Sequence, residues 1–369
     1  MLQLGLIYYN LDKHPEAIAS YKKVVEQFPG TPESRDALNG LKTVYVDKNE
    51  VDTYFAYLES KGQTSNVRVT EQDSLTYTAS ENLYMSGDCE KATQQFTKYL
   101  EKYKDGNFVL NANFYLADCN YKNQKMEDAL KGFEFVISAS HSMFTEQSLS
   151  AAAAIHYNKA NYTKALELYK RMETEAEIKT NVLGAKIGQM RCYFRLSNYD
   201  NAILSAKSLL LSEKVPEEIN REAYYVLAKS NLEINNTGAA TEELKLVAKD
   251  MKSAEGAECK YLLAKLYYDQ NKKDAAQKEI MNFIDKNTPY QFWLGKSFIL
   301  LSDIYVDRKD EFQAVNTLKS ILDYYENNDD GIKSEAKQKY DKLVSENASL
   351  QVKEKQQDIE VDLDKQKKQ

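Results

Sequence analysis

Two short stretches, Asn161-Tyr162-Thr163-Lys164-Ala165-Leu166 and Asn198-Tyr199-Asp200-Asn201-Ala202-Ile203, repeat one pattern and decide the fold. After Ala165 and after Ala202, apolar or small residues follow four and seven positions later, which places them on one side of an α-helix. Another helical pattern precedes each stretch, at 148–158 and 181–196, and ends in a short polar break. The sequence therefore predicts a pair of helices that buries its apolar stripes by stacking on copies of itself.

The same alanine marks further copies of this unit along the chain, at Ala17, Ala92, Ala129, Ala165, Ala202, Ala240, Ala276 and Ala314. From Ala92 onward the steps are 37, 36, 37, 38, 36 and 38 residues. The gap of 75 residues between Ala17 and Ala92 equals two steps, and the unit without an alanine centres near Tyr54. We therefore predict nine helix pairs, of which the one at 37–61 is degenerate.

The first unit resembles the tetratricopeptide repeat, because Leu4-Gly5, Tyr8, Ala17, Tyr21, Val24 and Pro29 fall at the spacing of that family. The chain departs from the family in its longer period. It also replaces the usual glycine of the first helix, in successive units, by Ser80, Ala117, Ala153, Met190, Ala228, Ala264 and Ser302. The resemblance covers about 1–328 and implies an all-α, right-handed solenoid of about nine antiparallel helix pairs.

The predicted domain organisation has three parts. Residues 1–330 form the helical repeat array, and 331–349 form a C-terminal helix that covers the open apolar end of the array. Residues 350–369 are a charged tail, whose composition fits disorder or an exposed helix. Trp293, at the start of the last first helix, is expected to be largely buried against the preceding repeat.

Composition and scattered motifs argue against several function classes. The net charge is −7, with 49 basic and 56 acidic residues, so no basic surface indicates nucleic-acid binding. No apolar run approaches the ~20 residues of a membrane span. The three histidines lie far apart, which predicts no metal site, and no motif predicts a cofactor. The four cysteines, Cys89, Cys119, Cys192 and Cys259, are interpreted as small packing residues that leave the redox compartment open. We predict that the chain is not an enzyme.

The resemblance further implies that the first helix of each pair lines a concave groove. Aligned on the alanines, these helices carry a column that is acidic, then basic, then acidic along the chain, between two largely aromatic or apolar columns. The predicted partner-binding residues are Tyr77, Tyr84, Phe114, Tyr121, Tyr157, Arg191, Phe194, Arg195, Tyr225, Lys229, Tyr261, Lys265 and Tyr268. One interpretation is a strip that binds an acidic, partly extended segment through its aromatic and basic side chains. The other is solvated helix charges above core aromatics. On the first interpretation, Arg191→Glu with Lys229→Glu abolishes binding and leaves stability unchanged.

Three functions remain open at this stage. The first is a scaffold that binds a partner protein or peptide in the groove. The second is a structural subunit of a bacterial cell-envelope complex associated with the outer membrane, which similar repeat proteins rich in Tyr, Asn and Lys suggest. The third is a repeat platform for an enzyme whose catalytic part lies outside this chain. The periplasm or cell envelope is favoured slightly over the cytoplasm, and the oligomeric state stays open.

Overall fold

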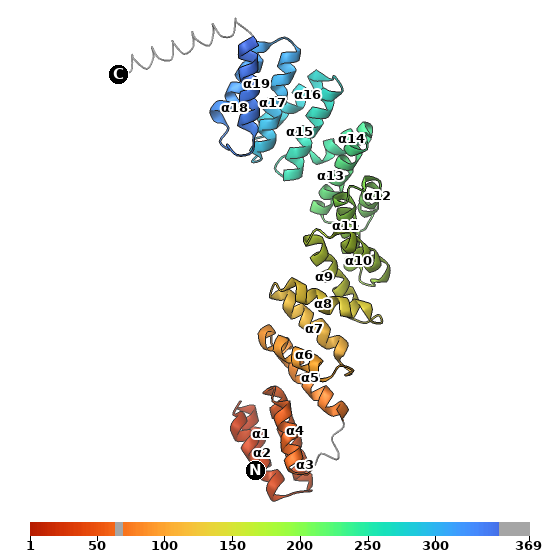
Figure 1. The fold of residues 1–369 in the computed structure, drawn as a ribbon, viewed down its shortest axis with the longest axis vertical. Helices are drawn as coiled ribbons and strands as arrows, with labels where there is room; N and C mark the ends of the chain where they lie inside the picture. The colour runs from red at the N-terminus through yellow and green to blue at the C-terminus, as the bar shows by residue number, and fades with distance from the viewer. Residues whose placement is uncertain (63–68, 347–369) are drawn as a thin grey trace, which may run out of the picture. The chain divides into compact units, whose positions relative to one another are not determined.

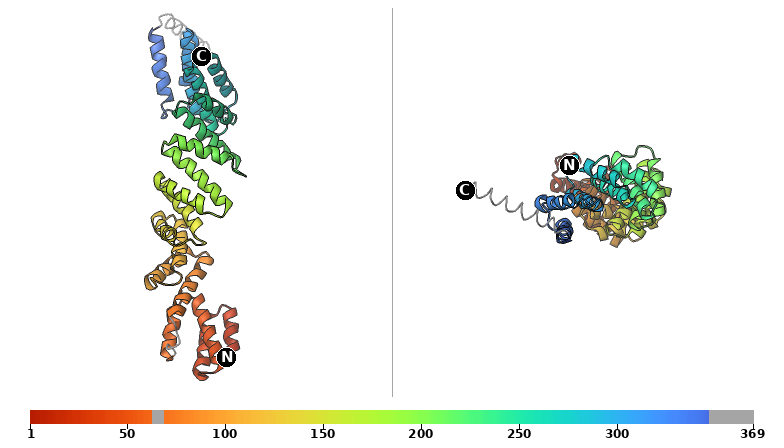
Figure 2. Two further views of the ribbon diagram at one scale, coloured as in Figure 1. Left: turned by 90° about the vertical axis from the view of Figure 1, so that its right-hand side faces the viewer. Right: turned by 90° about the horizontal axis from the view of Figure 1, so that it is seen from above.

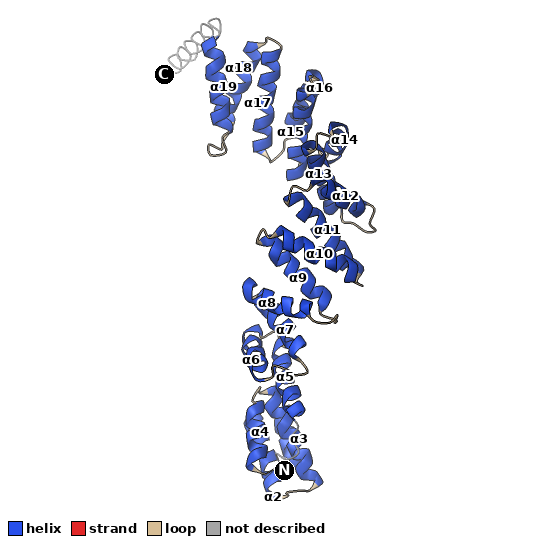
Figure 3. Cartoon of the chain, turned by 45° about the vertical axis from the view of Figure 1, so that its right-hand side comes forward, coloured by secondary structure: helices blue, strands red, loops and turns tan. Residues whose placement is uncertain are grey.

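The computed structural model describes residues 1–62 and 69–346. The predicted tail at 350–369 lies outside the described residues. The chain divides into two compact units, one from Met1 to Ala185 and one from Lys186 onward. Each unit consists of helices joined by loops, and no strand occurs in the residues described (Figure 3). The predicted all-α architecture of stacked antiparallel helix pairs is therefore confirmed.

The helices follow one another in chain order as pairs (Figure 1). In the first unit they are α1 (Leu2–Asn10), α2 (His14–Gln27), α3 (Pro32–Asp47), α4 (Val51–Ser60), α5 (Val69–Met85), α6 (Cys89–Lys102), α7 (Val109–Lys122), α8 (Met126–Ser138), α9 (Thr145–Asn158) and α10 (Tyr162–Glu175). The boundary between the units falls within α11 (Lys179–Arg195). The second unit continues with α12 (Tyr199–Leu210), α13 (Glu217–Glu233), α14 (Thr237–Val247), α15 (Ala254–Asp269), α16 (Lys273–Asp285), α17 (Gln291–Asp307), α18 (Glu311–Tyr324) and α19 (Ile332–Glu346).

One turn joins the two helices of every pair. Its central residue has a positive φ in each of the nine pairs within 1–62 and 69–346: Asp12, Asn49, Gly87, Gln124, Ala160, Ser197, Asn235, Asn271 and Lys309. The next residue donates its backbone N–H to a carbonyl five positions earlier, for example from Asn161 to His156 at 2.9 Å. This is the Schellman arrangement that ends a helix. The same residue is the N-cap of the second helix, so one short turn ends one helix and begins the next.

The marker alanines lie where the helices of a pair cross. All eight of them, from Ala17 to Ala314, have no exposed surface. Their partners in the first helices are also buried, and these are the residues that replace the usual glycine, such as Ser80, Ala117 and Met190. A larger side chain at an alanine position would separate the two backbones, because the interior is packed to near-crystalline density.

Glycine provides the close approach at the N-terminal end, where α1, α2 and α3 pack together (Figure 2). Tyr21 of α2 is 4% exposed. A Cβ on Gly5 would lie 2.6 Å from the Tyr21 ring, and a Cβ on Gly40 would lie 2.5 Å from it. The ring therefore occupies the space that two glycines leave on the neighbouring first helices.

The repeat predicted to be degenerate at 37–61 forms a helix pair, α3 and α4, that starts earlier than predicted. Its second helix has ten residues and buries Tyr54, which is 6% exposed. At the other end of the described residues, α19 packs against α17 and α18 through Ile332, Ala336 and Tyr340. Trp293 packs against the preceding repeat, as predicted. It stacks on Tyr261, with 5.6 Å between the ring centroids, and is half-buried.

Candidate partner-binding site

Two of the predicted aromatic anchors belong to the core of the first unit. Tyr77 is 4% exposed and Phe114 is 3% exposed. Tyr77 stacks on Phe108 at 4.4 Å, and Phe114 stacks on Phe144 at 4.3 Å, so each ring packs on the residue that precedes the next first helix. These stacked contacts make the two rings part of the contact between repeats.

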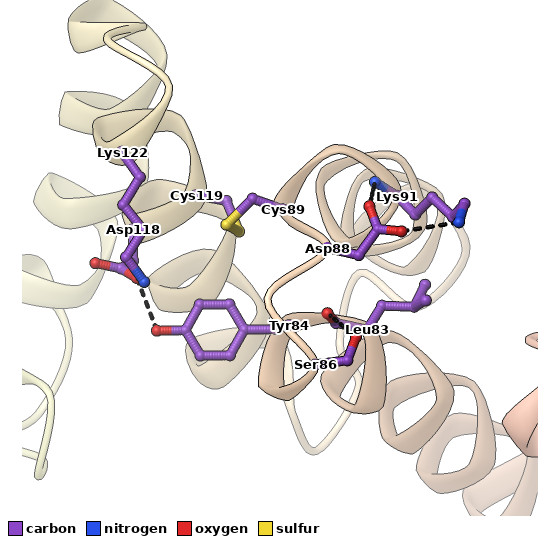
Figure 4. Close-up of a disulfide and its surroundings, with 9 residues drawn as sticks. All are labelled: Leu83, Tyr84, Ser86, Asp88, Cys89, Lys91, Asp118, Cys119 and Lys122. Carbon is purple, nitrogen blue, oxygen red and sulfur yellow. Dashed lines mark hydrogen bonds and ion pairs between the residues drawn. A yellow bond between two sulfur atoms is a disulfide. The ribbon is translucent and has the colours of Figure 1, made fainter.

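Three other aromatic residues of the predicted site in this unit are half-buried. The Tyr84 hydroxyl donates to Asp118 Oδ2 at 2.7 Å, a bond from α5 to α7 (Figure 4). Burial and this bond raise the pKa of Tyr84. Tyr121 packs edge-on to Phe133 at 6.2 Å, and Tyr157 packs edge-on to Tyr162 at 5.2 Å.

The basic residues of the second unit have carboxylate partners within the chain. Arg191 donates from Nε and Nη2 to the two oxygens of Glu222, at 2.6 Å each. Lys229 Nζ donates to Glu258 Oε1 at 2.7 Å, and the Tyr225 hydroxyl donates to Glu258 Oε2 at 2.8 Å. Each of these bonds links one first helix to the next. These ion pairs count against the expectation that reversing Arg191 and Lys229 leaves stability unchanged, because the reversal would set like charges against each other.

The remaining residues of the predicted site in the second unit are half-buried or exposed. Phe194, Tyr261, Lys265 and Tyr268 are half-buried, and Arg195 is exposed. Lys265 pairs with Asp269 at 2.9 Å, one turn further along α15. The Tyr268 hydroxyl donates to Asp307 Oδ2 at 2.9 Å, and burial together with this bond raises the pKa of Tyr268 to about 12.

Hydroxyl-to-carboxylate bonds of this kind explain part of the tyrosine content, which is 27 residues. They join consecutive first helices at four places, from Tyr9 to Asp47, Tyr84 to Asp118, Tyr225 to Glu258 and Tyr268 to Asp307. A tyrosine at such a position buries its ring against the neighbouring repeat while its hydroxyl finds an acceptor there. The aromatic columns therefore stabilise the array whether or not they also bind a partner.

The cysteines differ from the expectation in one respect. Cys89, the first residue of α6, and Cys119 in α7 form a disulfide, with their Cα atoms 5.2 Å apart (Figure 4). The interpretation of all four cysteines as unpaired packing residues is wrong for this pair, because stacking brings α6 against α7 of the next repeat. Cys192 and Cys259 are free and buried, as expected, and burial raises the pKa of the Cys192 thiol to about 12.

A hollow at α9 is the largest cavity that we describe, with a volume of about 880 Å³. Most of its lining was not predicted from the sequence, because Met143, Glu146, Glu177 and Ile178 lie outside the aligned columns. A signal was present in the columns. Ser150 stands where the neighbouring first helices carry Phe114 and Ile187, and Ala154 stands where they carry Asp118 and Arg191.

Within 1–62 and 69–346, no group of three or more His, Cys, Asp or Glu is placed to hold a metal ion. None of the described helices combines the length and the apolar character needed to cross a bilayer.

Comparison with known proteins gives one sequence match and several structural ones. Residues 1–31 match the family model of the tetratricopeptide repeat. The fold is similar to the C-terminal part of a TPR repeat-containing protein from Cytophaga hutchinsonii, at 16% identity and a TM-score of 0.52, over 69% of this chain and 97% of that chain. A tetratricopeptide repeat protein from Parabacteroides merdae is also similar, at 17% identity and a TM-score of 0.41, over 72% of this chain and 97% of that chain. No curated protein matches the sequence. The chain therefore has the fold of a tetratricopeptide-repeat protein, and its first helix pair matches the model of that repeat.

Proposed function

We propose that this chain is a non-enzymatic scaffold that binds a partner protein or peptide along its first helices. The observation that best supports the proposal is the row of half-buried side chains on α11, α13 and α15. Phe194, Tyr261 and Tyr268 each keep part of a ring accessible beside a charged residue. Rigid aromatic side chains that expose one face are the usual anchors of protein interfaces.

The charge of the partner depends on which basic side chains of this row can reach it. An acidic segment would have to compete with Glu222 for Arg191 and with Glu258 for Lys229. Lys265 is paired within its own helix, with Asp269, in the described contacts. We therefore propose that an acidic partner approaches near Lys265, with the aromatic rings of Tyr261 and Tyr268 beside it.

Site-specific photocross-linking tests which face binds. A benzophenone side chain is placed at Lys265 on α15 or, as the matched control, at Lys278, an exposed lysine on α16. The proposal predicts one stoichiometric cross-linked partner from position 265 and none from position 278. A partner captured only from position 278 would assign binding to the second helices, and capture from neither position would count against a scaffold function.

The disulfide favours a second candidate, a structural subunit of a cell-envelope complex. Disulfides persist in oxidising compartments and are rare in the cytosol. The test is to trap thiols in intact cells with acid and then label them with a maleimide that changes electrophoretic mobility. The envelope role predicts that Cys89 and Cys119 are oxidised in cells, whereas labelling of both would favour a reducing compartment.

A further inference from the structure

The hollow at α9 exists because one repeat lacks the large side chains that its neighbours carry. At one inward-facing position of the first helices, α5 carries Tyr77 and α7 carries Phe114, and each ring stacks on a residue of the following loop. In α9 the equivalent residue is Ser150, and Ala154 follows one turn later. Two small side chains leave the cavity of about 880 Å³, which is within the range of ligand pockets in proteins.

Apolar side chains stand around this cavity at the surface. Met143 in the loop before α9 is 87% exposed, and Ile178 in the loop before α11 is 56% exposed. Both residues line the cavity, as does the ring of Tyr121. A partner that covered Met143 and Ile178 would remove apolar surface from water, which favours association.

The charge of the lining is negative. Asp118, Glu146 and Glu177 contribute carboxylates, and the basic residue among the lining side chains is His141. Asp118 is balanced by Lys122 at 2.6 Å. Glu146 and Glu177 form no ion pair within the described residues.

Glu146 is held in place by neutral donors. Its two oxygens accept from the backbone N–H of Glu177 at 2.8 Å and from the side-chain amide of Asn181 at 2.7 Å. These hydrogen bonds, first that of Asn181 and then that of Glu177, lower the pKa of Glu146 and keep it ionised. The cavity therefore contains a fixed negative charge that no Lys or Arg side chain of the lining compensates, and His141 is the basic residue of the lining that acts on it.

We propose that the hollow at α9 binds a segment of a partner protein that inserts a lysine or arginine side chain beside an apolar one. The cation lies between Glu146 and Glu177, and the apolar side chain lies against Met143, Ile178 and Tyr121. Charge complementarity selects the basic residue, because an acidic one would meet uncompensated carboxylates. This inference rests on the proposed scaffold function and adds a second, oppositely charged binding position within residues 1–185.

The test uses the full chain and a displayed library of random 12-residue peptides. Selection on the unaltered protein is followed by counter-selection on Ser150→Phe, which fills the hollow with the ring that Phe114 carries in the preceding repeat. Recovered peptides are synthesised with a fluorescent label, and their Kd values are measured by anisotropy. If Ser150→Phe alters the melting curve, Ala154→Gln replaces it, since Glu81 and Asp118 show that this column accepts longer side chains.

The proposal predicts that the recovered peptides carry Lys or Arg next to an apolar residue. Exchange of that basic residue for Glu, or Glu177→Lys in the protein, weakens binding about tenfold, as expected for loss of one charge-assisted contact. The control Glu16→Lys, an exposed charge on α2, has the same net charge as Glu177→Lys and leaves Kd unchanged.

Peptides without basic residues, equal binding to Ser150→Phe, or the absence of any binder would each overturn the inference. The scaffold function is judged separately, by cross-linking from position 265. A partner captured there while the peptide selection fails would retain the scaffold and remove only the site at α9.

Discussion

Arg191 and Glu222 form a bidentate ion pair between neighbouring repeats, with Nε to Oε1 and Nη2 to Oε2 both at 2.6 Å. One repeat later Lys229 makes the corresponding contact to Glu258 at 2.7 Å. The basic residues that share one column in the sequence therefore face carboxylates of the next first helix. Their positive charge is available to a partner only in competition with those carboxylates.

Reversing one charge of this pair and exchanging both charges should have different effects on the free energy of unfolding. Arg191→Glu places two carboxylates together and is expected to lower the free energy of unfolding by about 1 kcal/mol or less, since the Arg191 and Glu222 side chains are 40% and 25% exposed. Arg191→Glu combined with Glu222→Arg should recover most of that loss, as urea unfolding would show. If the double variant lost as much unfolding free energy as the two single variants together, or more, the ion pair would not contribute to stability.

The turn between the paired helices offers a reciprocal test. Ala160 has a φ of 58° and Gly87, at the equivalent place, has a φ of 84°. Because a side chain disfavours this conformation, Ala160→Gly should raise the free energy of unfolding by about 0.5–1 kcal/mol, and Gly87→Ala should lower it by about 1 kcal/mol. No atom lies within 4 Å of the added Cβ at Gly87, so the effect is conformational. Thermal melts that shift in the same direction for both variants would contradict this.

The buried alanines should not accept a larger side chain. Ala165 has no exposed surface, and Ala165→Leu is expected to cost ~1–3 kcal/mol by forcing α9 and α10 apart. The matched control is Ala19→Leu, the same exchange at an exposed helical position. Chemical denaturation should separate the two, and an equal loss for both variants would point to helix propensity instead of packing.

Breaking the Cys89–Cys119 disulfide should destabilise the first unit. The cysteines are separated by 30 residues in sequence, and releasing that loop costs about 3–4 kcal/mol in the chain-entropy model. Cys89→Ala should therefore unfold at lower denaturant, and a reductant should affect the parent protein but not the variant. Thiol titration of the unfolded, unreduced protein should find the two thiols of Cys192 and Cys259, and a count of four would exclude the bond.

The last helix should be needed for solubility. Ile332, Ala336 and Tyr340 of α19 are buried against a cluster that includes Ile299, Leu318 and Ile321. A chain that ends at Asp330 exposes this cluster and is expected to melt earlier or to aggregate, as light scattering during heating would detect. A chain that ends at Glu346 keeps every described contact of α19 and serves as the control. Equal melting of the two chains would show that α19 does not protect the end of the array.

The repeat could be predicted from the sequence because its physical basis is local. Each helix pair packs only on its neighbours, so a residue such as Ala165 meets the same requirement as Ala202 and recurs at a nearly constant step. The positions of Ser80, Ala117 and Met190 follow from the same register, and all three are buried. The aromatic columns were also visible, but the sequence did not separate rings that pack between repeats, such as Tyr77 and Phe114, from rings with an accessible face, such as Tyr261.

Contacts between repeats were decided only by the tertiary structure, because they depend on loop conformation and on how far successive first helices are displaced. The bond between Cys89 and Cys119 joins residues that occupy different places in their repeats, so no periodicity indicates it. Likewise, the sequence places Arg191 in a strip of basic residues, whereas the structure pairs it with Glu222 of the next first helix. At α9 the sequence shows that Ser150 is small. That the space beside it is a cavity follows only from the structure, in which the loops carrying Met143 and Ile178 line this space and do not fill it.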